Sequence, residues 1–308
     1  MNIITKCLKK KNHCVRNNKI LSFISFILTY LINNLLIYFS YILSTKPDNL
    51  KLSSNDILFT TVCNDNYYLG LAVLLYSLQK YNNNFTYKFK IYYQDDLSDK
   101  NKLNLQKIYK NLIFENITDT RLKNLEKWFS CLIVFSEYEY KRVIFIDSDI
   151  ICLGDINDMI YGKVANLGIC MDTNFSLLTN LKINFPKVCE VNTGVMVIDK
   201  KYRNKEFFEK IINYSVNNPN TSLGDQGVLN IFIRNQVITY LPTKYNCKKR
   251  VFYTINYLNY KDPKLIHFAG VNKPFIETKE KMIRSKICNN LINEYFYHLD
   301  KVKEIIDS

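Results

Sequence analysis

The feature that most constrains the fold is a short apolar segment that ends in two acidic residues. Residues 141–146 (KRVIFI), which are apolar from Val143 onward, continue directly into Asp147, Ser148 and Asp149, and a second apolar segment, residues 150–153, follows. An apolar run without alternation is typical of a strand that is buried on both faces, as in the centre of a parallel sheet. The sequence therefore predicts a central strand with two carboxylates at its carboxyl end.

The two carboxylates are a candidate cation site. Alternate residues of an extended strand point to the same side, so we expect Asp147 and Asp149 to reach one ion. Carboxylate oxygens suit a Mg²⁺ or Mn²⁺ ion that also binds a diphosphate. Acidic pairs are also common in solvated turns, so a polar turn without a ligand is the alternative.

Strands and helices are predicted to alternate ahead of this pair. Apolar side chains recur at the helical spacing i, i+3, i+4 and i+7 at Leu71, Leu74, Leu75 and Leu78. The predicted order is strand 56–62, helix 71–78, strand 89–93, helix 99–110 and strand 112–114. Such alternation favours an α/β fold with a mainly parallel sheet. Ligands of such sheets bind at the carboxyl ends of strands, so the turn at 64–67 is a candidate binding loop.

Charge and cysteine content exclude some classes of protein. The formal net charge is +14, but the lysines are scattered and arginine forms no stripe, so we expect no nucleic-acid partner. The nine cysteines form no CxxC pair and no zinc-binding spacing. We expect most of them to be small buried side chains. One or two disulfides are the alternative if the domain lies in an oxidising compartment.

The N-terminal part is predicted to be a membrane anchor. Residues 20–45 carry no charge and are long enough to cross a bilayer, although Asn33 and Asn34 interrupt the apolar run. Lysine and arginine precede this segment, so residues 1–19 are expected to form a basic cytoplasmic tail and 46–55 a short stem. This organisation predicts a single-pass type II membrane protein with a lumenal domain of the ER or Golgi type. A buried core helix is the alternative.

Three later motifs make the pattern more specific. Asn192-Thr193-Gly194 precedes an apolar strand, GDQGVLN at residues 224–230 opens a helix, and HFAGVNKPF occupies residues 267–275. Six of the eight glycines lie in or beside the motifs, at Gly70, Gly154, Gly194, Gly224, Gly227 and Gly270. Together with the acidic pair, and in this order, the motifs resemble the glycogenin-like branch of glycosyltransferase family 8.

The resemblance covers about residues 57–275 and implies a fold and an activity. It implies a GT-A nucleotide-sugar-binding, Rossmann-like single domain at residues 56–308, ending in C-terminal helices. It also implies that a hexose moves from a UDP-sugar to an acceptor hydroxyl with retention of anomeric configuration, with Mn²⁺ or Mg²⁺ as cofactor. Asp147, Asp149 and His267 match the metal ligands of the family. The donor-binding positions are Asn64, Tyr67, Lys127, Asp147, Ser148, Asp149, Asn192, Gly194, Asp225, Gln226, His267, Gly270 and Lys273.

The expected mechanism follows from these positions. The metal and Lys273 stabilise the leaving diphosphate, while Asp225 and Gln226 lie beside the oxocarbenium-like carbon as the catalytic residues. The acceptor hydroxyl attacks from the face that the diphosphate leaves. Because the sequence shows no strong nucleophile, we do not infer a covalent intermediate. Trp128, next to Lys127, is interpreted as a core residue.

Other functions remain as alternatives. The first is a catalytically inactive nucleotide-sugar-binding or scaffold module of the same fold. The second is a nucleotidyltransferase, which should carry a glycine-rich phosphate loop near the first strand; residues 64–67 contain no glycine. The acceptor, whether glycan, protein or lipid, and the formation of a homodimer stay open.

Overall fold

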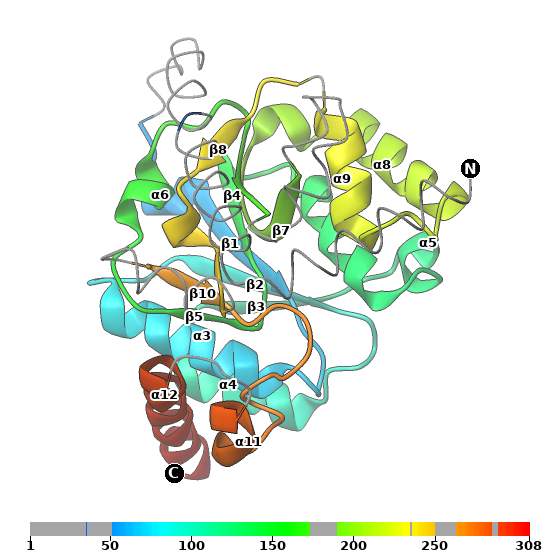
Figure 1. Ribbon diagram of the computed structural model, residues 1–308. Coiled ribbons are helices and arrows are strands. Elements are labelled where there is room, and N and C mark those ends of the chain that lie inside the picture. Colours follow the sequence, from blue (N-terminus) through cyan, green and yellow to red (C-terminus); the bar gives the residue numbers. More distant parts are fainter. Residues whose placement is uncertain (1–34, 36–50, 173–189, 235, 250–262, 285–288) are drawn as a thin grey trace, which may run out of the picture.

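The computed structural model describes residue 35 and residues 51–172, 190–234, 236–249, 263–284 and 289–308. A seven-stranded sheet of order β3-β2-β1-β4-β7-β6-β8 forms its centre (Figure 1). The strands are β1 (Ile57–Val62), β2 (Lys88–Tyr93), β3 (Leu112–Asn116), β4 (Arg142–Ile146), β6 (Leu167–Met171), β7 (Val191–Asp199) and β8 (Thr239–Leu241). The described residues therefore confirm the α/β class.

The sheet is mainly parallel, as expected, but one change of direction positions the site. β3, β2, β1 and β4 run parallel to one another, whereas β7 is antiparallel to both β4 and β6. In this register Val195 is opposite Ile146. The amino end of β7, with Asn192 and Gly194, therefore lies beside the carboxyl end of β4.

A second, three-stranded sheet brings a distant segment to the same place. It consists of β5 (Ile150–Cys152), β10 (Leu265–His267) and β9 (Cys247–Lys248), with β10 in the middle. β10 is antiparallel to β5, and His267 is opposite Ile150. The backbone N–H of Phe268 also donates to the carbonyl of Asp149 at 3.0 Å. This pairing holds the end of β10 against the acidic turn.

Side chains alternate along the central strands between two apolar clusters. On β1, Phe59 belongs to the cluster under α3 (Tyr68–Tyr81), whereas Leu58 belongs to the opposite one. On β4, Ile144 and Phe145 separate in the same way. All four side chains are buried, as the lack of alternation in the sequence of β4 predicts.

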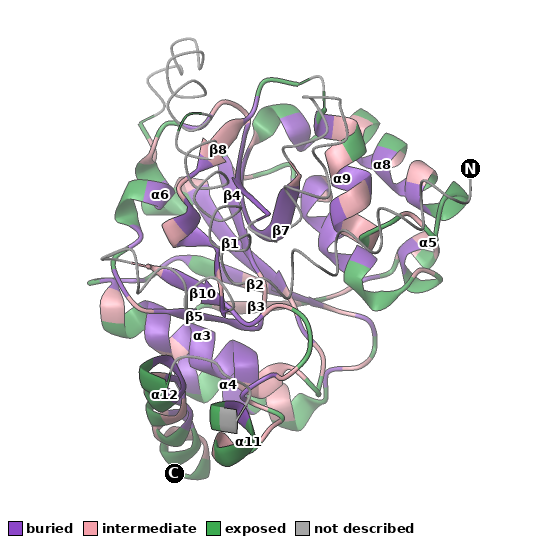
Figure 2. Ribbon diagram, viewed as in Figure 1, coloured by how far each residue is buried: buried purple, intermediate pink, exposed green. Residues whose placement is uncertain are grey.

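Helices cover both faces of the large sheet (Figure 1). α3, α4 (Asp99–Ile108) and α12 (Asn289–Asp307) lie on one side, and η2 (Lys127–Ser136), α8 (Lys205–Asn217) and α9 (Gly224–Ile233) pack on the other. Their outward faces are exposed, while the sheet between them is buried (Figure 2). The shorter helical segments are η1 (Ser54–Asp56), α5 (Thr120–Lys123), α6 (Asn157–Tyr161), η4 (Lys200–Tyr202), η5 (Thr243–Tyr245) and α11 (Lys279–Arg284).

The C-terminal end of the chain forms a helix, whereas most of the N-terminal end lies outside the described residues. The C-terminal helix expected near residue 291 is α12, and it buries Leu291, Tyr295, Leu299 and Val302. Within the described residues, none of the helices combines the length and apolar character that a membrane crossing requires. Apart from Leu35, the expected tail and anchor lie outside the described residues.

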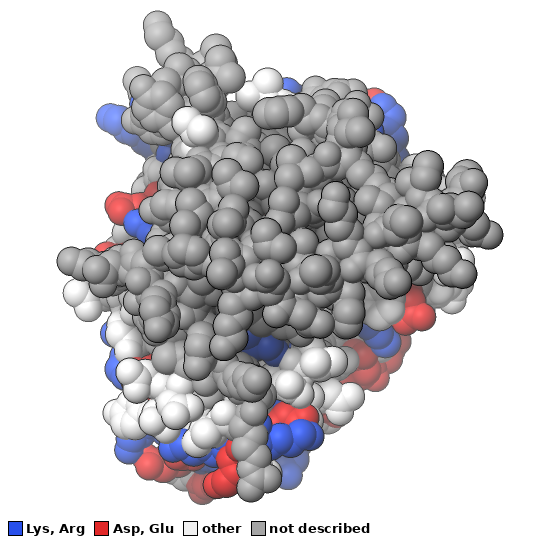
Figure 3. All heavy atoms as spheres, viewed as in Figure 1, with Lys and Arg blue, Asp and Glu red and all other residues white. Residues whose placement is uncertain are grey.

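Charged side chains of both signs lie near the C-terminus, and the described cysteines agree with the expectation of buried side chains. Basic and acidic side chains are interspersed along the edge formed by α11 and α12 (Figure 3), with ion pairs such as Lys301–Glu304 at 2.7 Å. Five of the nine cysteines fall in the described ranges, and all five are buried free thiols: Cys63, Cys131, Cys152, Cys170 and Cys247.

Candidate functional site

The acidic pair lies in a turn and not on an extended strand, so the expected geometry was wrong in this respect. β4 ends at Ile146 and β5 begins at Ile150, and residues 147–149 carry the chain from the large sheet to the small one. Hydrogen bonds from each side hold the turn. The N–H of Asp147 donates to the carbonyl of Gly194 at 2.9 Å, and the carbonyl of Asp149 accepts from Phe268.

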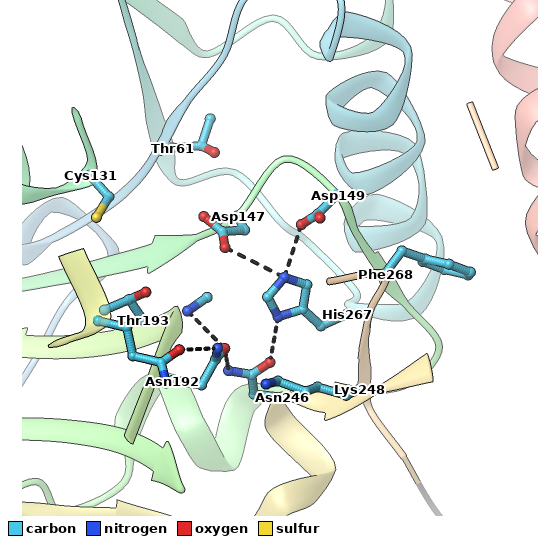
Figure 4. Close-up of polar contacts among 12 residues, drawn as sticks. Thr61, Cys131, Asp147, Asp149, Asn192, Thr193, Asn246, Lys248, His267 and Phe268 are labelled. Atoms are coloured by element: carbon cyan, nitrogen blue, oxygen red, sulfur yellow. Dashed lines mark hydrogen bonds and ion pairs between the residues drawn. The ribbon is translucent and has the colours of Figure 1, made fainter. Parts of the chain in front are cut away.

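The turn nevertheless brings both carboxylates to one imidazole (Figure 4). His267 Nε2 lies 3.1 Å from Asp149 Oδ1 and 3.5 Å from Asp147 Oδ2. Their candidate ligand atoms all lie within 4.8 Å of one another. Gly194 makes room for the ring, because a Cβ at this position would lie 2.4 Å from His267 Cε1. The three predicted metal ligands therefore meet in space.

The two carboxylates lie in different electrostatic environments. The side chain of Asp149 is only 7% exposed, and burial alone would raise its pKa. The adjacent His267 and the ammonium of Lys273 outweigh burial and hold the pKa of Asp149 below its usual range. Desolvation and the Asp149 charge raise the pKa of Asp147, although its side chain remains 37% exposed. The site thus contains one carboxylate whose charge is compensated and a second whose ionised form is less favourable.

This donor set fits a divalent cation. Two carboxylates and an imidazole nitrogen suit an ion such as Mn²⁺, and they leave coordination positions for other ligands. His267 Nδ1 is engaged by Asn246 Oδ1 at 2.9 Å, so Nε2 is the nitrogen that faces the carboxylates. Asp147, Asp149 and His267 are accordingly the residues that would hold the ion.

A cavity of about 290 Å³ adjoins the acidic turn. Seven of the residues predicted from the sequence line it: Asn64, Tyr67, Lys127, Asp147, Ser148, Asp149 and Asp225. The cavity lies at the carboxyl ends of β1 and β4, where parallel sheets bind their ligands. The structure therefore gathers the predicted positions from four separate parts of the sequence around one space.

One end of the cavity is formed by the turn after β1. The N–H of Tyr67 donates to the carbonyl of Asn64 at 2.9 Å, which closes the turn. The Tyr67 ring packs against Phe275 at a centroid distance of 5.2 Å, and Lys273 Nζ lies 5.7 Å from the centre of the Tyr67 ring. An aromatic face and a cation therefore lie together here.

Another wall of the cavity belongs to η2. Lys127 forms an ion pair with Asp96 at 2.8 Å. The interpretation of Trp128 as a core residue was wrong, because its side chain is 56% exposed and lines the cavity. The first residues of η2 face outward, whereas Phe129 and Leu132 face the core.

Asp225 lies at the start of α9 with two donors beside it. Thr193 Oγ1 donates to Asp225 Oδ2 at 2.7 Å, and the Cys131 thiol donates to the same oxygen at 3.2 Å. Burial raises the pKa of Asp225, and these two hydrogen bonds act in the opposite direction. Leu223 and Gly224, which precede Asp225, both adopt positive φ angles, of 68° and 58°.

The remaining predicted residues lie behind or beside the cavity. Asn192 and Gln226 are buried and hydrogen bonded to each other at 2.9 Å. Lys273 forms a short ion pair with Asp149 Oδ2 and donates to the carbonyl of Phe268 at 2.9 Å. Gly270 has a φ of 76°, a backbone conformation in which a residue with a side chain would be strained.

Sequence reasoning missed three polar residues behind the cavity, in addition to Thr193. Asn246 joins His267 to Asn192, and Asp172 accepts from Gln226 at 2.8 Å and from Lys248 at 2.5 Å. Asp172 had a detectable signal, because it directly follows the buried strand β6 just as Asp147 follows β4. Asn246 and Lys248 had none, since Asn246 precedes a two-residue strand in a polar segment and Lys248 ends it.

Comparison with known proteins identifies the family. Residues 59–278 match glycosyl transferase family 8, and the chain belongs to this family. Over 232 residues it is 25% identical to glycogenin-1 of Caenorhabditis elegans, which covers 70% of this chain. The matched region spans 50% of glycogenin-1, about half of that protein's length.

Solved glycosyltransferases share the fold at low identity. A galactosyltransferase, LgtC, solved with donor and acceptor sugar analogs, aligns with a TM-score of 0.63 at 14% identity, over 79% of this chain and 95% of LgtC. The apo structure of the bifunctional glycosyltransferase WbbM aligns with a TM-score of 0.61 at 17% identity, over 85% of this chain and 53% of WbbM. These similarities confirm a GT-A-like α/β fold.

Proposed function

We propose that this protein is a glycosyltransferase that moves a hexose from a UDP-sugar to an acceptor hydroxyl, with retention of anomeric configuration and dependence on Mn²⁺ or Mg²⁺. The observation that carries the proposal is the meeting of Asp147, Asp149 and His267 beside the cavity. Membership of family 8 supports glycosyl transfer. The donor, the stereochemistry and the metal are our own inference.

Different residues around the cavity are proposed to bind different parts of the donor. Asn64, Tyr67 and Lys127 lie on the side proposed for the nucleoside, where the ring of Tyr67 offers a face to the base. Lys273 and the backbone at Gly270 serve the diphosphate. A divalent ion, when bound, supplies Lewis-acid stabilisation of the leaving diphosphate.

In the proposed reaction, the bonds break and form on the side of the cavity where Asp225 lies. The anomeric C–O bond breaks, and its electron pair leaves with the diphosphate. The acceptor oxygen forms the new bond on the same face, and its proton passes to the departing diphosphate oxygen. Asp225, ionised, stabilises the developing positive charge on the sugar. Gln226, fixed by Asn192 and Asp172, orients the sugar.

The location in the cell belongs to the same proposal. The uncharged residues 20–45 anchor the protein as a single-pass type II membrane protein. The domain from residue 56 onward then lies in the lumen, where a glycan, a protein or a lipid provides the acceptor hydroxyl.

A panel of UDP-sugars tests the proposed reaction. The full-length protein is incubated with each donor, with and without Mn²⁺, and UDP release is measured together with transfer. We expect metal-dependent release from one donor, which Asp149→Ala abolishes. Tight metal-dependent UDP binding without turnover would instead identify an inactive nucleotide-sugar-binding module. Absence of any UDP binding would overturn the proposal.

A further inference from the structure

Three buried side-chain amides connect the candidate metal site to Asp172 at the end of β6. We call Asn246, Asn192 and Gln226 the amide relay (Figure 4 labels the first two). One end of the relay meets His267, and the other end meets Asp172, which pairs with Lys248. All three amides are at most 7% exposed, so water does not substitute for these contacts.

Each step of the relay is a hydrogen bond of normal length. His267 Nδ1 lies 2.9 Å from Asn246 Oδ1, and Asn246 Nδ2 lies 2.7 Å from Asn192 Oδ1. Asn192 Nδ2 lies 2.9 Å from Gln226 Oε1, and Gln226 Nε2 lies 2.8 Å from Asp172 Oδ2. The relay therefore runs without a gap from an imidazole to a carboxylate.

Two fixed groups determine which way every amide points. The carboxylate of Asp172, paired with the Lys248 ammonium at 2.5 Å, accepts hydrogen bonds, so Gln226 must present its NH₂ group to it. Independently, the backbone N–H of Gly194 donates to Asn192 Oδ1 at 3.1 Å, which identifies that atom as an oxygen. Both anchors assign the same orientation to Asn192.

The orientation of Asn246 then follows by exclusion. If this amide were reversed, its oxygen would face the oxygen of Asn192 at 2.7 Å with no proton between them. Asn246 must therefore donate to Asn192 and present Oδ1 to His267. An oxygen without a proton can only accept, so His267 Nδ1 must carry the hydrogen of this bond.

We propose that Asn246 is a positioning residue that holds a proton on Nδ1 of His267. With Nδ1–H engaged by Asn246, Nε2 is the nitrogen that faces Asp147 and Asp149, where a cation would bind. Partners of this kind set the tautomer and orientation of metal-binding imidazoles. The inference rests on the proposed function only in naming a metal as the ligand of Nε2. The same relay holds Gln226, so Asn246 links the metal ligand to the sugar side.

Nitrogen NMR of the histidine rings tests the protonation of Nδ1 directly, without metal or substrate. The chain has only three histidines, and His267→Gln assigns the signal of His267. In the full-length protein we expect Nδ1 to carry a proton, whether or not Nε2 is protonated as well. We expect Asn246→Leu to leave Nδ1 unprotonated in part or all of the molecules. An unprotonated Nδ1 in the wild-type protein would overturn the proposal.

Metal affinity gives the second test, with a conservative variant as the control. Asn246→Asp still accepts from His267 Nδ1–H, and when its other carboxyl oxygen is protonated it also donates to Asn192. We expect Asn246→Leu to weaken Mn²⁺ binding by about 10–100-fold and Asn246→Asp to stay within a few-fold of wild type. Equal losses in both variants would show that the role of Asn246 is merely structural and would overturn the proposal.

A variant of Asn82, a buried asparagine outside the site, distinguishes a positioning role from a general effect on stability. Asn82 Oδ1 accepts from the N–H of Ile156 at 2.8 Å, and its Nδ2 donates to the carbonyl of Leu78 at 3.0 Å. We expect Asn82→Leu to lower the unfolding temperature without changing the protonation of His267 Nδ1 or Mn²⁺ affinity. If Mn²⁺ fails to bind wild type while the proton on Nδ1 is observed, the proposed metal dependence fails and the role of Asn246 stands.

Discussion

Lys273 and Asp149 form a buried ion pair through Asp149 Oδ2, while the other oxygen of the same carboxylate lies 3.1 Å from His267 Nε2. Asp149 is therefore shared between a cation of the protein and the candidate metal site. The two side chains are 10% and 7% exposed, so this charge balance is maintained away from water. Lys273 compensates the carboxylate in the structure, and in our account it also neutralises the diphosphate.

Replacement of Lys273 by methionine should affect the nucleotide and the metal differently. We expect Lys273→Met to weaken UDP binding by roughly 10–100-fold, because a charged hydrogen bond contributes about 1.5–3 kcal/mol. Binding of Mn²⁺ alone should not weaken, because a competitor for Asp149 has been removed. Calorimetric titrations measure both. The matched control is Lys281→Met, which removes an exposed lysine paired with Glu277. Unchanged UDP affinity in Lys273→Met would argue against its diphosphate role.

Gly194 should be intolerant of a single added methyl group. A Cβ at this position would lie 2.4 Å and 2.6 Å from two atoms of the His267 ring, which is held by β10 and Asn246. We expect Gly194→Ala to displace the ring and lower Mn²⁺ affinity at least 10-fold, as measured by electron paramagnetic resonance of free Mn²⁺. Gly154→Ala is the control, because its Cβ would meet only the flexible chain of Lys264. Equal Mn²⁺ affinity in the two variants would contradict the account.

Replacement of Thr193 by valine should shift the pH dependence of activity. Burial raises the pKa of Asp225, and the hydroxyl of Thr193 opposes this rise by donating at 2.7 Å. Loss of the hydroxyl in Thr193→Val should raise the pKa of Asp225 further. If ionised Asp225 is needed, the acidic limb of kcat/KM moves to higher pH by about one unit, since one hydrogen bond contributes about 1 kcal/mol.

The conservative variant controls for packing at the same position. Thr193→Ser keeps the donor, so its acidic limb should coincide with that of wild type. At a pH well above the pKa of Asp225 in both wild type and Thr193→Val, the kcat/KM of Thr193→Val should return to the wild-type value. An acidic limb that does not move in Thr193→Val would exclude Asp225 as the group that controls it.

Much of the site could be predicted because its residues occupy the ends of regular elements. Asp147 and Asp149 follow a buried strand, and the turn at Asn64 follows another, so the topology of the sheet brings them together. His267 is 118 residues away from Asp149 in sequence, and only the resemblance to a family connected the two. The pairing of β10 with β5 explains the contact, but a three-residue strand carries too weak a pattern to predict it.

The predictions that the structure contradicts, and the residue that the sequence did not reveal, have physical explanations as well. The acidic pair was expected on a strand, but the chain changes sheets there, which requires a turn. Trp128 was expected in the core, yet it lies where η2 begins and its side chain is exposed. Asn246 could not be found from the sequence, because its importance comes from groups that fold around it and not from its neighbours in the chain.

The most direct test of the central claim is equilibrium binding of UDP to the full-length protein in the presence and absence of Mn²⁺. We predict that UDP binds tightly only with Mn²⁺ and that Asp149→Ala loses this metal-dependent binding. The control Asp158→Ala, in which an exposed carboxylate of α6 is removed, should retain it. UDP binding that is equally tight without Mn²⁺, or that survives in Asp149→Ala, would contradict the assignment of Asp147, Asp149 and His267 as the metal site of a nucleotide-sugar enzyme.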